Sequence, residues 1–508
     1  MMYFLIVIFI ILLYSYGSKN LDYWKRKGVI HERPVILFGN RLKQFREGVS
    51  LSEHYANIYN RYPNERYVGY YSMRKASLLL RDPELIRHVL SADFKYFHHR
   101  GLIDAANTPD VLLRNIVHGD GDIWKLLRQK LTPTFSNTKL KAMFPLIVEH
   151  TVRLVQLADA SAESRTEVDV RELMAKYTTD FIGACGFGLD FDSYKSEDSE
   201  FRKIGKRIFT ITLPNLLALA FKDAFPELTK SIRILDLDIE QKMIALVKKI
   251  MTERGYEPSG RNDFIDFLLE MKQKGKIRGE SIEIIKPDGT PEMVELDASD
   301  ELLTAQVLTF FAAGYEPSSH ASGYLLHQLA YHPEEQARCH REVDEVLSRY
   351  DGKLSYEAVK EMMYLEMALK EALRMIPSPG FFLRSCVHKY TLPGTDLTID
   401  PKTQIIVSLQ ALHNDPQYFE QPEKFNPSRF ESLDKSLKYV YMPFGEGPRS
   451  CIGERLAIMQ SMAGVAAILS RFTLTPSKNS TPVPRVDPKS LIVQNFAGGL
   501  PLILSKRF

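Results

Sequence analysis

The chain has few cysteines for its length. Its 508 residues contain only four, Cys185, Cys339, Cys386 and Cys451. No two of them have the C-x-x-C spacing of a metal site, and four in so long a chain are too sparse for a disulfide framework. We therefore expect the chain to lie in a reducing, cytosol-facing environment.

The chain also lacks a strong net charge and any obvious internal division. Its formal net charge is only +3, which argues against a nucleic-acid partner. No Pro/Gly/Ser-rich linker, low-complexity tract or internal repeat divides it into domains. A G-x-G-x-x-G motif after a strand is missing too, so no flavin or nicotinamide domain is indicated.

The N-terminus is strongly apolar. Residues Met2 to Tyr16 form an apolar run, and basic residues follow it at 25–27. A secretory signal has its charge before the run and a small-residue cleavage site after it, so a retained anchor fits better than a cleaved signal or a core helix. About fifteen residues reach roughly 23 Å, short of the ~30 Å bilayer core, and nearby aromatic side chains offset part of the difference. We predict an anchor over 1–18, a linker over 19–40 and a cytosolic domain over 41–508.

Apolar periodicity indicates a mostly helical chain with short strands. Aromatic and apolar residues predict β-structure over 66–81, and alternation around a Pro-Gly pair predicts strands over 388–410. The lysine- and glycine-rich stretch 272–289 predicts a solvated loop. The predicted helices cover 140–160, 165–190, 299–330, 332–348 and 356–375.

One cysteine lies in a loop of unusual composition. Residues 444–453 read Phe-Gly-Glu-Gly-Pro-Arg-Ser-Cys-Ile-Gly, and a helical run follows directly. A helix N-terminus stabilises a thiolate through backbone N–H groups and the helix dipole. The glycines let the backbone approach a flat ligand, and Arg449 can reach an anionic group. These features indicate that Cys451 binds iron through its sulfur; the alternative is a chance loop around a buried structural cysteine.

The loop resembles the ligand loop F-x-x-G-x-R-x-C-x-G of the cytochrome P-450 superfamily of haem-thiolate monooxygenases. Every fixed position is matched, by Phe444, Gly447, Arg449, Cys451 and Gly453. The resemblance implies a mostly α fold with small β-sheets, built as a single large haem domain behind the N-terminal anchor. It also implies haem b as the cofactor, with Cys451 as the axial thiolate ligand that favours O–O cleavage.

Three arginines and a tryptophan match the family's haem-propionate partners. Trp124 and Arg128 are four residues apart, so they share one face of a helix. In the family this pair hydrogen-bonds a propionate, and Arg384 and Arg449 resemble further propionate-binding arginines. Three arginines against two carboxylates are chemically sensible, because charge-assisted pairs are strong. The alternative for Trp124 and Arg128 is a packed tryptophan beside a solvated arginine. His413 either joins the propionate-binding set or has a packing role.

A second set of charged residues resembles the family's structural lock. Glu371 and Arg374 are three residues apart in an apolar helical segment, so the pair is predicted to be buried. The family's E-x-x-R pair binds an arginine further along the chain, which corresponds here to Arg429. Ser428 replaces the glutamate that the family commonly has before that arginine. The resemblance gives these residues a role in haem incorporation, not in catalysis.

The main departure from the family lies in the long predicted helix. The pattern A-G-x-[E/D]-T-[T/S] is matched by Ala313, Gly314 and Glu316, but Pro317 stands at the threonine position. In the family the small residues leave room for dioxygen, and the acid–alcohol pair relays protons toward it. Proline has no N–H and crowds the Ala313 carbonyl, so we expect the helix to kink or widen and that carbonyl to hold a water. Ser318 lies about 100° round the helix from Pro317 and replaces the threonine only if the kink turns it inward.

Three functions remain open. In the first, water and Glu316 replace the threonine, and the chain is a monooxygenase that inserts one atom of O2 into an apolar substrate with some leakage to peroxide. In the second, it is a haem-thiolate isomerase or dehydratase that needs no dioxygen activation. In the third, it is a non-catalytic haem carrier. We favour the first.

Several motifs resemble insect microsomal members that clear foreign compounds. This implies xenobiotic or lipophilic endogenous substrates, a location in the endoplasmic reticulum membrane and electrons from NADPH–cytochrome reductase, with cytochrome b5 as a second candidate partner. By the same resemblance, the apolar segment 207–225 covers the substrate channel and touches the membrane, although it could be a core helix. The reductase would dock on a basic patch, unless these are ordinary solvated side chains: Lys125, Lys130, Lys139, Lys141 and Arg455. Candidates for the substrate pocket, or for core packing, are Phe310, Phe311, Ala312, Phe381, Phe382 and Phe496.

Overall fold

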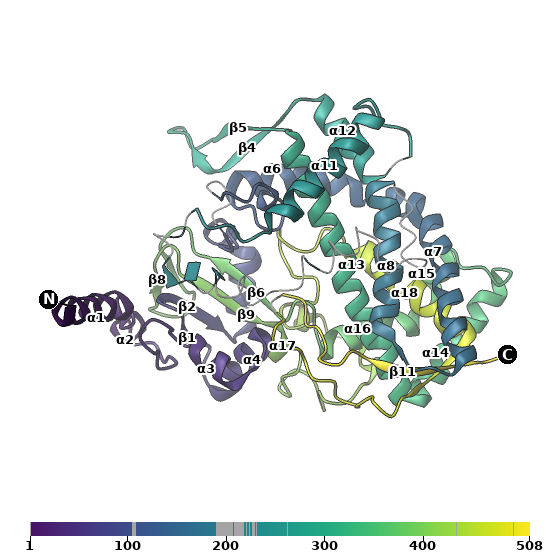
Figure 1. Cartoon of the computed structure of the whole chain (residues 1–508). Helices are drawn as coiled ribbons and strands as arrows, with labels where there is room; N and C mark the ends of the chain where they lie inside the picture. The colour runs from purple at the N-terminus through teal and green to yellow at the C-terminus, as the bar shows by residue number, and fades with distance from the viewer. Residues whose placement is uncertain are drawn as a thin grey trace.

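The computed structural model describes residues 2–103, 108–188, 231–261, 263–432, 434–490 and 492–508, with isolated positions between 207 and 229. The predicted segment 207–225 lies almost wholly outside them. The described chain is mostly helical, with its short strands gathered mainly on one side (Figure 1).

The helices alternate with four small groups of strands. The helices are α1 (Met2–Ser18), α2 (Tyr23–Arg26), α3 (Arg41–Glu47), α4 (Leu51–Arg61), α5 (Pro83–Arg87), α6 (Gly121–Leu131), α7 (Asn137–Ser164), α8 (Val170–Phe187), α11 (Leu237–Glu253), α12 (Phe264–Gln273), α13 (Asp300–Tyr331), α14 (Pro333–Arg349), α15 (Tyr356–Glu361), α16 (Met363–Met375), α17 (Leu409–Leu412) and α18 (Glu454–Arg471). The strands are β1 (Tyr67–Ser72), β2 (Lys75–Leu80), β3 (Val168–Asp169), β4 (Lys276–Ile285), β5 (Pro291–Asp297), β6 (Phe381–Ser385), β7 (Tyr390–Thr391), β8 (Thr398–Ile399), β9 (Gln404–Ser408), β10 (Phe472–Pro476) and β11 (Pro501–Lys506).

Helix α13 runs through the middle of the molecule and confirms the helix predicted over 299–330 (Figure 1). It begins where the Ser299 hydroxyl accepts from the backbone N–H of Leu302 (3.2 Å), and it ends just before Pro333, which cannot continue the helix. The helix packs along α8 and also against α18, α11 and α16 (Figure 1). Pro317 lies inside it without ending it. This central helix therefore carries the predicted oxygen-site residues through the main core.

A four-stranded sheet forms a second core beside the helices. Its order is β1-β2-β9-β6, with β2 and β9 parallel and the other pairs antiparallel. Buried aromatic side chains such as Trp24, Tyr55 and Tyr70 pack against it, and the Trp24 indole donates to the carbonyl of Tyr70 (3.1 Å). The predicted strand regions 66–81 and 388–410 are confirmed as β-structure by β1, β2, β7, β8 and β9.

Three predictions about local structure are wrong or only partly right. The stretch 272–289, expected as a solvated loop, contains β4, which pairs with β5 through a turn that includes Asp288 and Gly289. The sheet pairing supplies the backbone hydrogen bonds that lysine-rich composition does not reveal. The helix expected over 356–375 is two helices, α15 and α16, which are separated at Met362. The helix expected over 165–190 begins only after the short strand β3.

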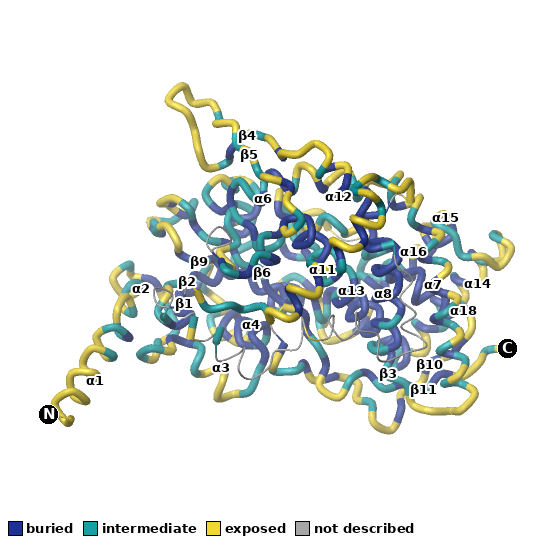
Figure 2. Tube along the Cα trace, turned by 45° about the horizontal axis from the view of Figure 1, so that its top comes forward, coloured by how far each residue is buried: buried dark blue, intermediate teal, exposed yellow. Residues whose placement is uncertain are grey.

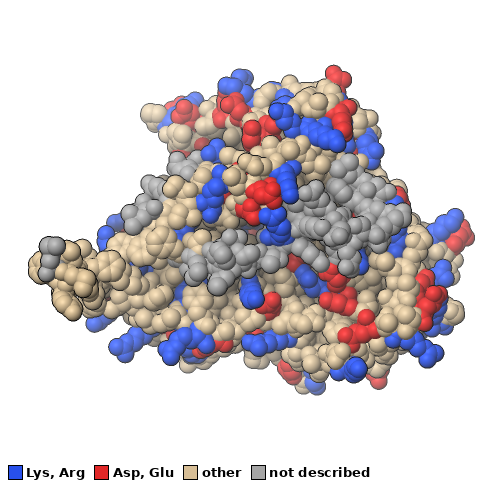
Figure 3. Space-filling model, viewed as in Figure 1, with Lys and Arg blue, Asp and Glu red and all other residues tan. Residues whose placement is uncertain are grey.

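The β4–β5 hairpin and helix α1 each project from the body of the molecule (Figure 1, Figure 2). The hairpin extends beyond the rest of the chain and is exposed along most of its length, while its base packs on α6 (Figure 2). Helix α1 presents apolar side chains to the surface on most of its positions, and no charged residue appears on it in Figure 3. Among the described residues, no helix combines the length and apolarity required to cross a membrane.

Candidate functional site

The Cys451 loop is a closed turn that presents the sulfur just before α18. The backbone N–H of Cys451 donates to the carbonyl of Phe444 (2.8 Å), and that of Ser450 donates to Gly447 (3.0 Å). Gly445 and Gly447 both have φ of +77°, and a Cβ on Gly447 would collide with the carbonyl of Leu90. Only glycine fits both the left-handed backbone and this close approach.

Cys451 and Ala313 both keep exposed surface, although Cys451 lies deep in the protein and Ala313 is in the middle of α13. Burial raises the pKa of the Cys451 thiol, while the Gly453 backbone N–H and the Arg128 and Arg100 guanidiniums favour the thiolate. A metal cation bound to the sulfur would keep Cys451 as the thiolate, because metal ligation needs the deprotonated form.

The predicted propionate partners come together from three parts of the chain. The Arg449 guanidinium lies over the Trp124 ring, 4.4 Å from its centroid. It donates to the carbonyls of His98 (2.7 Å) and Gly119 (3.0 Å) and to the carboxylate of Asp120 (2.9 Å). Arg128 donates to the carbonyl of Ser450 (2.7 Å), next to the cysteine.

Buried positive charge exceeds buried negative charge at this site. Arg384, on β6, is buried, and burial together with the neighbouring Arg100 lowers its pKa to about 9. Burial and the same neighbour lower the pKa of Arg449 to about 8, although Asp120 opposes the shift. Arg449 Nη1 and Arg384 Nε have no hydrogen-bond partner among the described residues. Among the described residues of this cluster, four guanidiniums (Arg100, Arg128, Arg384, Arg449) accompany the carboxylate of Asp120. This excess of positive charge is suited to a ligand with two carboxylates, so these residues fit haem propionates.

Arg100 is a member of this cluster that the sequence interpretation missed. Its guanidinium donates to the carbonyl of Val117 (3.0 Å) and approaches that of Arg449 (3.4 Å). Its backbone N–H donates to Asp120 (2.7 Å), so Asp120 orients both Arg100 and Arg449. Nothing near Arg100 in the sequence connects it with residue 449, and only the folded chain brings them together.

Glu371, Arg374 and Arg429 form a buried ion-pair network. Arg374 donates to both carboxylate oxygens of Glu371, from Nε (2.8 Å) and Nη2 (3.0 Å). Arg429 Nε donates to Glu371 Oε1 (3.0 Å), and the backbone N–H of Asn426 donates there as well (3.0 Å). Glu371 and Arg374 are fully buried, so the network desolvates its charges and compensates them with many hydrogen bonds.

His413 belongs beside this network. Its carbonyl accepts from Arg374 Nη1 (2.8 Å), and its ring Nε2 accepts from the backbone N–H of Met442 (3.0 Å). Burial lowers the pKa of His413 to about 3, with Arg374 as a further cause, so the ring is neutral. The histidine therefore links α16 to the segment that leads into the cysteine loop.

The residues of the α13 motif point in different directions. A Cβ on Gly314 would collide with Ile182 of α8, so this glycine allows close helix packing. Glu316 is buried and forms an ion pair with Arg171 of α8. Ser318 is buried, whereas Ala313 and Pro317 keep some exposed surface.

Pro317 has no N–H, so the Ala313 carbonyl lacks its usual helical donor. Two side chains contact the carbonyls that follow it along α13. Thr178 donates to the carbonyl of Tyr315 (3.1 Å), and Gln460 approaches that of Gly314 (3.5 Å). Carbonyls that accept a second bond tilt away from the helix axis, which is how a proline-bearing helix is accommodated.

Most of the candidate pocket aromatics pack against other rings. Phe310 stacks on Phe264 at 4.5 Å, and Phe311 stacks on Tyr315 at 5.6 Å. Phe496 stacks on His320 at 5.0 Å. In the remaining cases, the Phe381 ring meets Tyr55 edge-on, Phe382 approaches Gly445, and Ala312 is half-buried.

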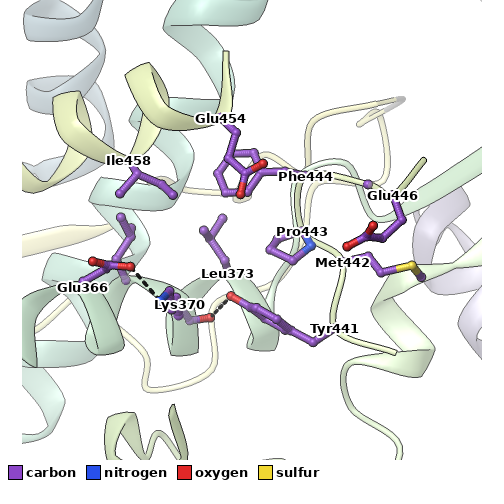
Figure 4. A pocket seen from close by; sticks show the side chains of 12 residues that line it. Glu366, Lys370, Leu373, Tyr441, Met442, Pro443, Phe444, Glu446, Glu454 and Ile458 are labelled. Atoms are coloured by element: carbon purple, nitrogen blue, oxygen red, sulfur yellow. Dashed lines mark hydrogen bonds and ion pairs between the residues drawn. The ribbon is translucent and has the colours of Figure 1, made fainter. Parts of the chain in front are cut away.

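A small pocket of about 190 Å³ lies beside the cysteine loop, between α16, the loop and the start of α18 (Figure 4). Glu366 pairs with Lys370 at 2.6 Å in its wall, and the Tyr441 hydroxyl donates to the carbonyl of Lys370 (3.0 Å). Burial raises the pKa of Glu454, and the nearby Glu446 adds to this shift. The pocket is therefore acidic and distinct from the arginine cluster.

Together, the helical fold, the cysteine loop and the arginine cluster define a haem-thiolate protein. The family described as Cytochrome P450 matches residues 31–498. Cytochrome P450 6B2 of Helicoverpa armigera is 34% identical over 494 residues, which cover 96% of this chain and 95% of the relative. Cytochrome P450 6a2 of Drosophila melanogaster is 34% identical over 509 residues, 98% of each chain. Cytochrome P450 6B1 of Papilio polyxenes is 34% identical over 495 residues, 97% of each chain.

The chain therefore belongs to the cytochrome P450 family. It is a haem monooxygenase, and Cys451 supplies the axial thiolate. Membership also implies a redox partner and apolar substrates.

Proposed function

We propose that this monooxygenase inserts one atom of O2 into lipophilic compounds, either xenobiotics or apolar endogenous molecules. The observation that carries the proposal is the exposed surface that both Cys451 and Ala313, in the middle of α13, keep. The similarity to insect relatives over nearly the whole chain supports the same class of chemistry.

The cysteine loop and the arginine cluster would hold the haem. Phe444 and Gly453 would frame it, Trp124 supports Arg449, and the guanidiniums would neutralise the two propionates. When bound, the haem supplies the iron at which dioxygen is reduced and split. The Glu371, Arg374 and Arg429 network stiffens the segment from α16 to the cysteine loop.

Protons are delivered from α13. Glu316 holds one carboxylate oxygen on Arg171, while its Oε2 is buried with no hydrogen-bond partner among the described residues. This oxygen can accept a hydrogen bond from a water. The Ala313 carbonyl, freed by Pro317, can accept one from another water. Ser318 is a weaker candidate for the relay, because it lies about 100° round the helix from Pro317.

Substrate occupies the space beside Ala312 and Ala313. Five phenylalanines either line this space or pack behind the side chains that line it: Phe310, Phe311, Phe381, Phe382 and Phe496. Small side chains at 312–314 keep this side of α13 open. The ring contacts of the phenylalanines give the walls fixed positions.

Electrons come from NADPH–cytochrome reductase, with cytochrome b5 as an additional donor. Lys130 and Arg455 are exposed on the cysteine side and suit an acidic partner. Lys125 instead donates to the carbonyl of Ser281 under the hairpin (3.4 Å), and Lys141 pairs with Glu357. The proposed dock therefore centres on Lys130 and Arg455.

Residues 1–18 anchor the enzyme in the endoplasmic reticulum membrane, 19–40 connect the anchor, and 41–508 form the haem domain on the cytosolic side. The apolar surface of α1 supports this arrangement, and exposed Val35, Phe38 and Phe221 provide further apolar contact. The aromatic ring of Tyr16 stacks on Phe225 at 5.2 Å, so α1 touches the described end of the apolar segment.

Pro317 favours a second candidate function. Without the threonine hydroxyl, the chain could act as a haem-thiolate isomerase or dehydratase on a substrate that already carries its oxygen, or simply carry haem. Turnover of a lipid hydroperoxide without NADPH or reductase would support the isomerase.

The deciding experiment uses isotopically labelled dioxygen, NADPH, reductase and a panel of apolar compounds. A monooxygenase transfers one labelled atom to the product and the other to water. Product without the label would instead assign the oxygen to the substrate or to water and overturn the proposal.

A further inference from the structure

Three potential metal ligands meet where the β4–β5 hairpin covers the start of α6. They are His98 and His99, which precede Arg100, and Glu283 of β4. One ligand atom from each lies within 4.8 Å of the others. The cluster lies outside the cysteine site, although the carbonyl of His98 accepts from Arg449 (2.7 Å).

His98 offers a free lone pair inside the protein. Its Nδ1 lies 3.0 Å from the carbonyl of Lys95, an acceptor only, so this nitrogen carries the proton and Nε2 has the lone pair. The side chain is 97% buried, and Nε2 has no hydrogen-bond partner among the described residues. A histidine whose second nitrogen is bound by a backbone carbonyl is oriented as metal-binding histidines usually are.

The spacing of the three atoms suits zinc. Glu283 Oε1 lies 2.8 Å from His99 Nε2 and 3.9 Å from His98 Nε2. With zinc–ligand bonds of about 2.0–2.2 Å in a tetrahedral site, ligand atoms lie roughly 3.3 Å apart, between these two distances. Two imidazoles and one carboxylate are a known zinc ligand set that leaves a fourth position for water.

The cluster has an entry path and a firm frame. Glu283 and His99 are partly exposed, so an ion can reach the site from solvent. Next to Glu283, the hydroxyl of Ser281 and the backbone N–H of Ile282 donate to Asp122 of α6 (2.9 and 2.6 Å). The carbonyl of His99 accepts from the backbone N–H of Ser385 on β6 (2.8 Å). Both halves of the site are therefore fixed independently of any ion.

We propose that His98, His99 and Glu283 bind one zinc ion, which fastens the β4–β5 hairpin to the segment that holds Arg449. A hydrogen bond between His99 and Glu283 alone would leave the buried Nε2 of His98 without a partner, which is unfavourable. Zinc satisfies all three atoms at once. The bound ion joins the hairpin, α6 and the arginine cluster into one unit.

The test is equilibrium dialysis of the full-length, haem-loaded protein, purified without a histidine tag, against Zn²⁺. We expect one zinc per chain. Glu283→Gln and His99→Gln should each weaken binding more than the roughly 10–100-fold that loss of an outer-shell partner costs. Glu295→Gln is the matched control, because it makes the same change on the same hairpin where Lys276 pairs with the carboxylate at 2.7 Å. Mg²⁺ and Ca²⁺, which prefer oxygen ligands, should not compete.

Hydrogen exchange supplies a second measurement. If the cluster had only a structural role and bound no zinc, adding zinc would not change the exchange rates. Zinc should slow exchange of the backbone amides of 276–297 in the wild type and in Glu295→Gln, but not in Glu283→Gln. A reduced carbon-monoxide difference spectrum that is the same in all variants shows that they retain haem. No zinc retained by the wild type, or equal affinity in Glu283→Gln and Glu295→Gln, would overturn the proposal.

Discussion

The carboxylate of Glu316 pairs with the guanidinium of Arg171 across the α8–α13 interface. The Glu316 side chain is almost fully buried and that of Arg171 mostly so, and Gly323 lets α13 approach the backbone of Arg171 closely. An acid that the sequence connects with proton delivery is thus also part of a buried ion pair between two core helices. Buried pairs are costly to break because one charge is left uncompensated.

Arg171→Met should therefore destabilise the protein by about 3–5 kcal/mol, measured by denaturant unfolding. The double variant Arg171→Met/Glu316→Leu should recover much of this loss, since it leaves no unpaired charge. The control Lys141→Met removes an exposed partner of Glu357 and should leave the unfolding midpoint nearly unchanged. Equal effects of Arg171→Met and Lys141→Met would contradict the buried pair.

Glu371→Gln should be among the most damaging conservative substitutions. It leaves Arg374 and Arg429 buried without their carboxylate, so we expect a loss of about 3–5 kcal/mol and rapid loss of haem. Glu345→Gln is the control, because Glu345 makes a comparable helical pair with Arg349 at the surface. Haem transfer to an acceptor protein measures the retention, and an unchanged transfer rate in Glu371→Gln would refute the proposed role of the network.

His413 should contribute to acid unfolding. Its pKa is lowered to about 3, so below about pH 6.5 the unfolded chain takes up a proton that the folded protein excludes. Its contribution is fully present above about pH 6.5 and is lost as the pH falls toward 3, by about 1.4 kcal/mol per pH unit.

His413→Gln can still accept from Met442 and should reduce the slope of unfolding free energy against pH by about one proton between pH 6.5 and 4.5. The exposed His388→Gln is the control and should keep the wild-type slope. A parallel pair of slopes for wild type and His413→Gln would show that His413 is not the group concerned.

Pro317→Thr should change how tightly NADPH consumption is coupled to product. A threonine restores a hydroxyl and a backbone N–H, so less peroxide should leak; a positioned proton donor is worth typically 10²–10⁴-fold in a proton-transfer step. Pro145→Thr, at an exposed position inside α7, is the control for replacing a helical proline. Tight coupling in the wild type that Pro317→Thr does not alter would exclude the leakage.

Cys451→Ser should abolish the thiolate-type band of the reduced carbon-monoxide difference spectrum, because a hydroxyl does not replace the thiolate as ligand. Cys185→Ser tests a buried cysteine of α8 away from the loop and should keep the band. Persistence of the band in Cys451→Ser would remove the basis of the haem assignment.

Features encoded in short contiguous stretches could be predicted from the sequence. The cysteine loop needs neighbouring glycines, an arginine and a helix start, and all of them lie within 444–453. Helix α13 could be predicted because its cap and apolar pattern are local, and Glu371 with Arg374 share one turn of α16. These elements depend on backbone propensity and on contacts three or four residues apart.

The sequence alone therefore determined that Cys451 is the iron ligand, that a long helix covers 299–330, and that Pro317 replaces the family's threonine. Only the tertiary structure decided that Arg100 joins the arginine cluster, that Glu316 pairs with Arg171, and that the stretch after α12 forms a hairpin whose Glu283 meets His98 and His99. Those partners are between about 145 and 350 residues apart in the chain. Such contacts between distant segments decide which charges are buried and which ligand atoms meet. Local sequence patterns do not show which distant segments will come together.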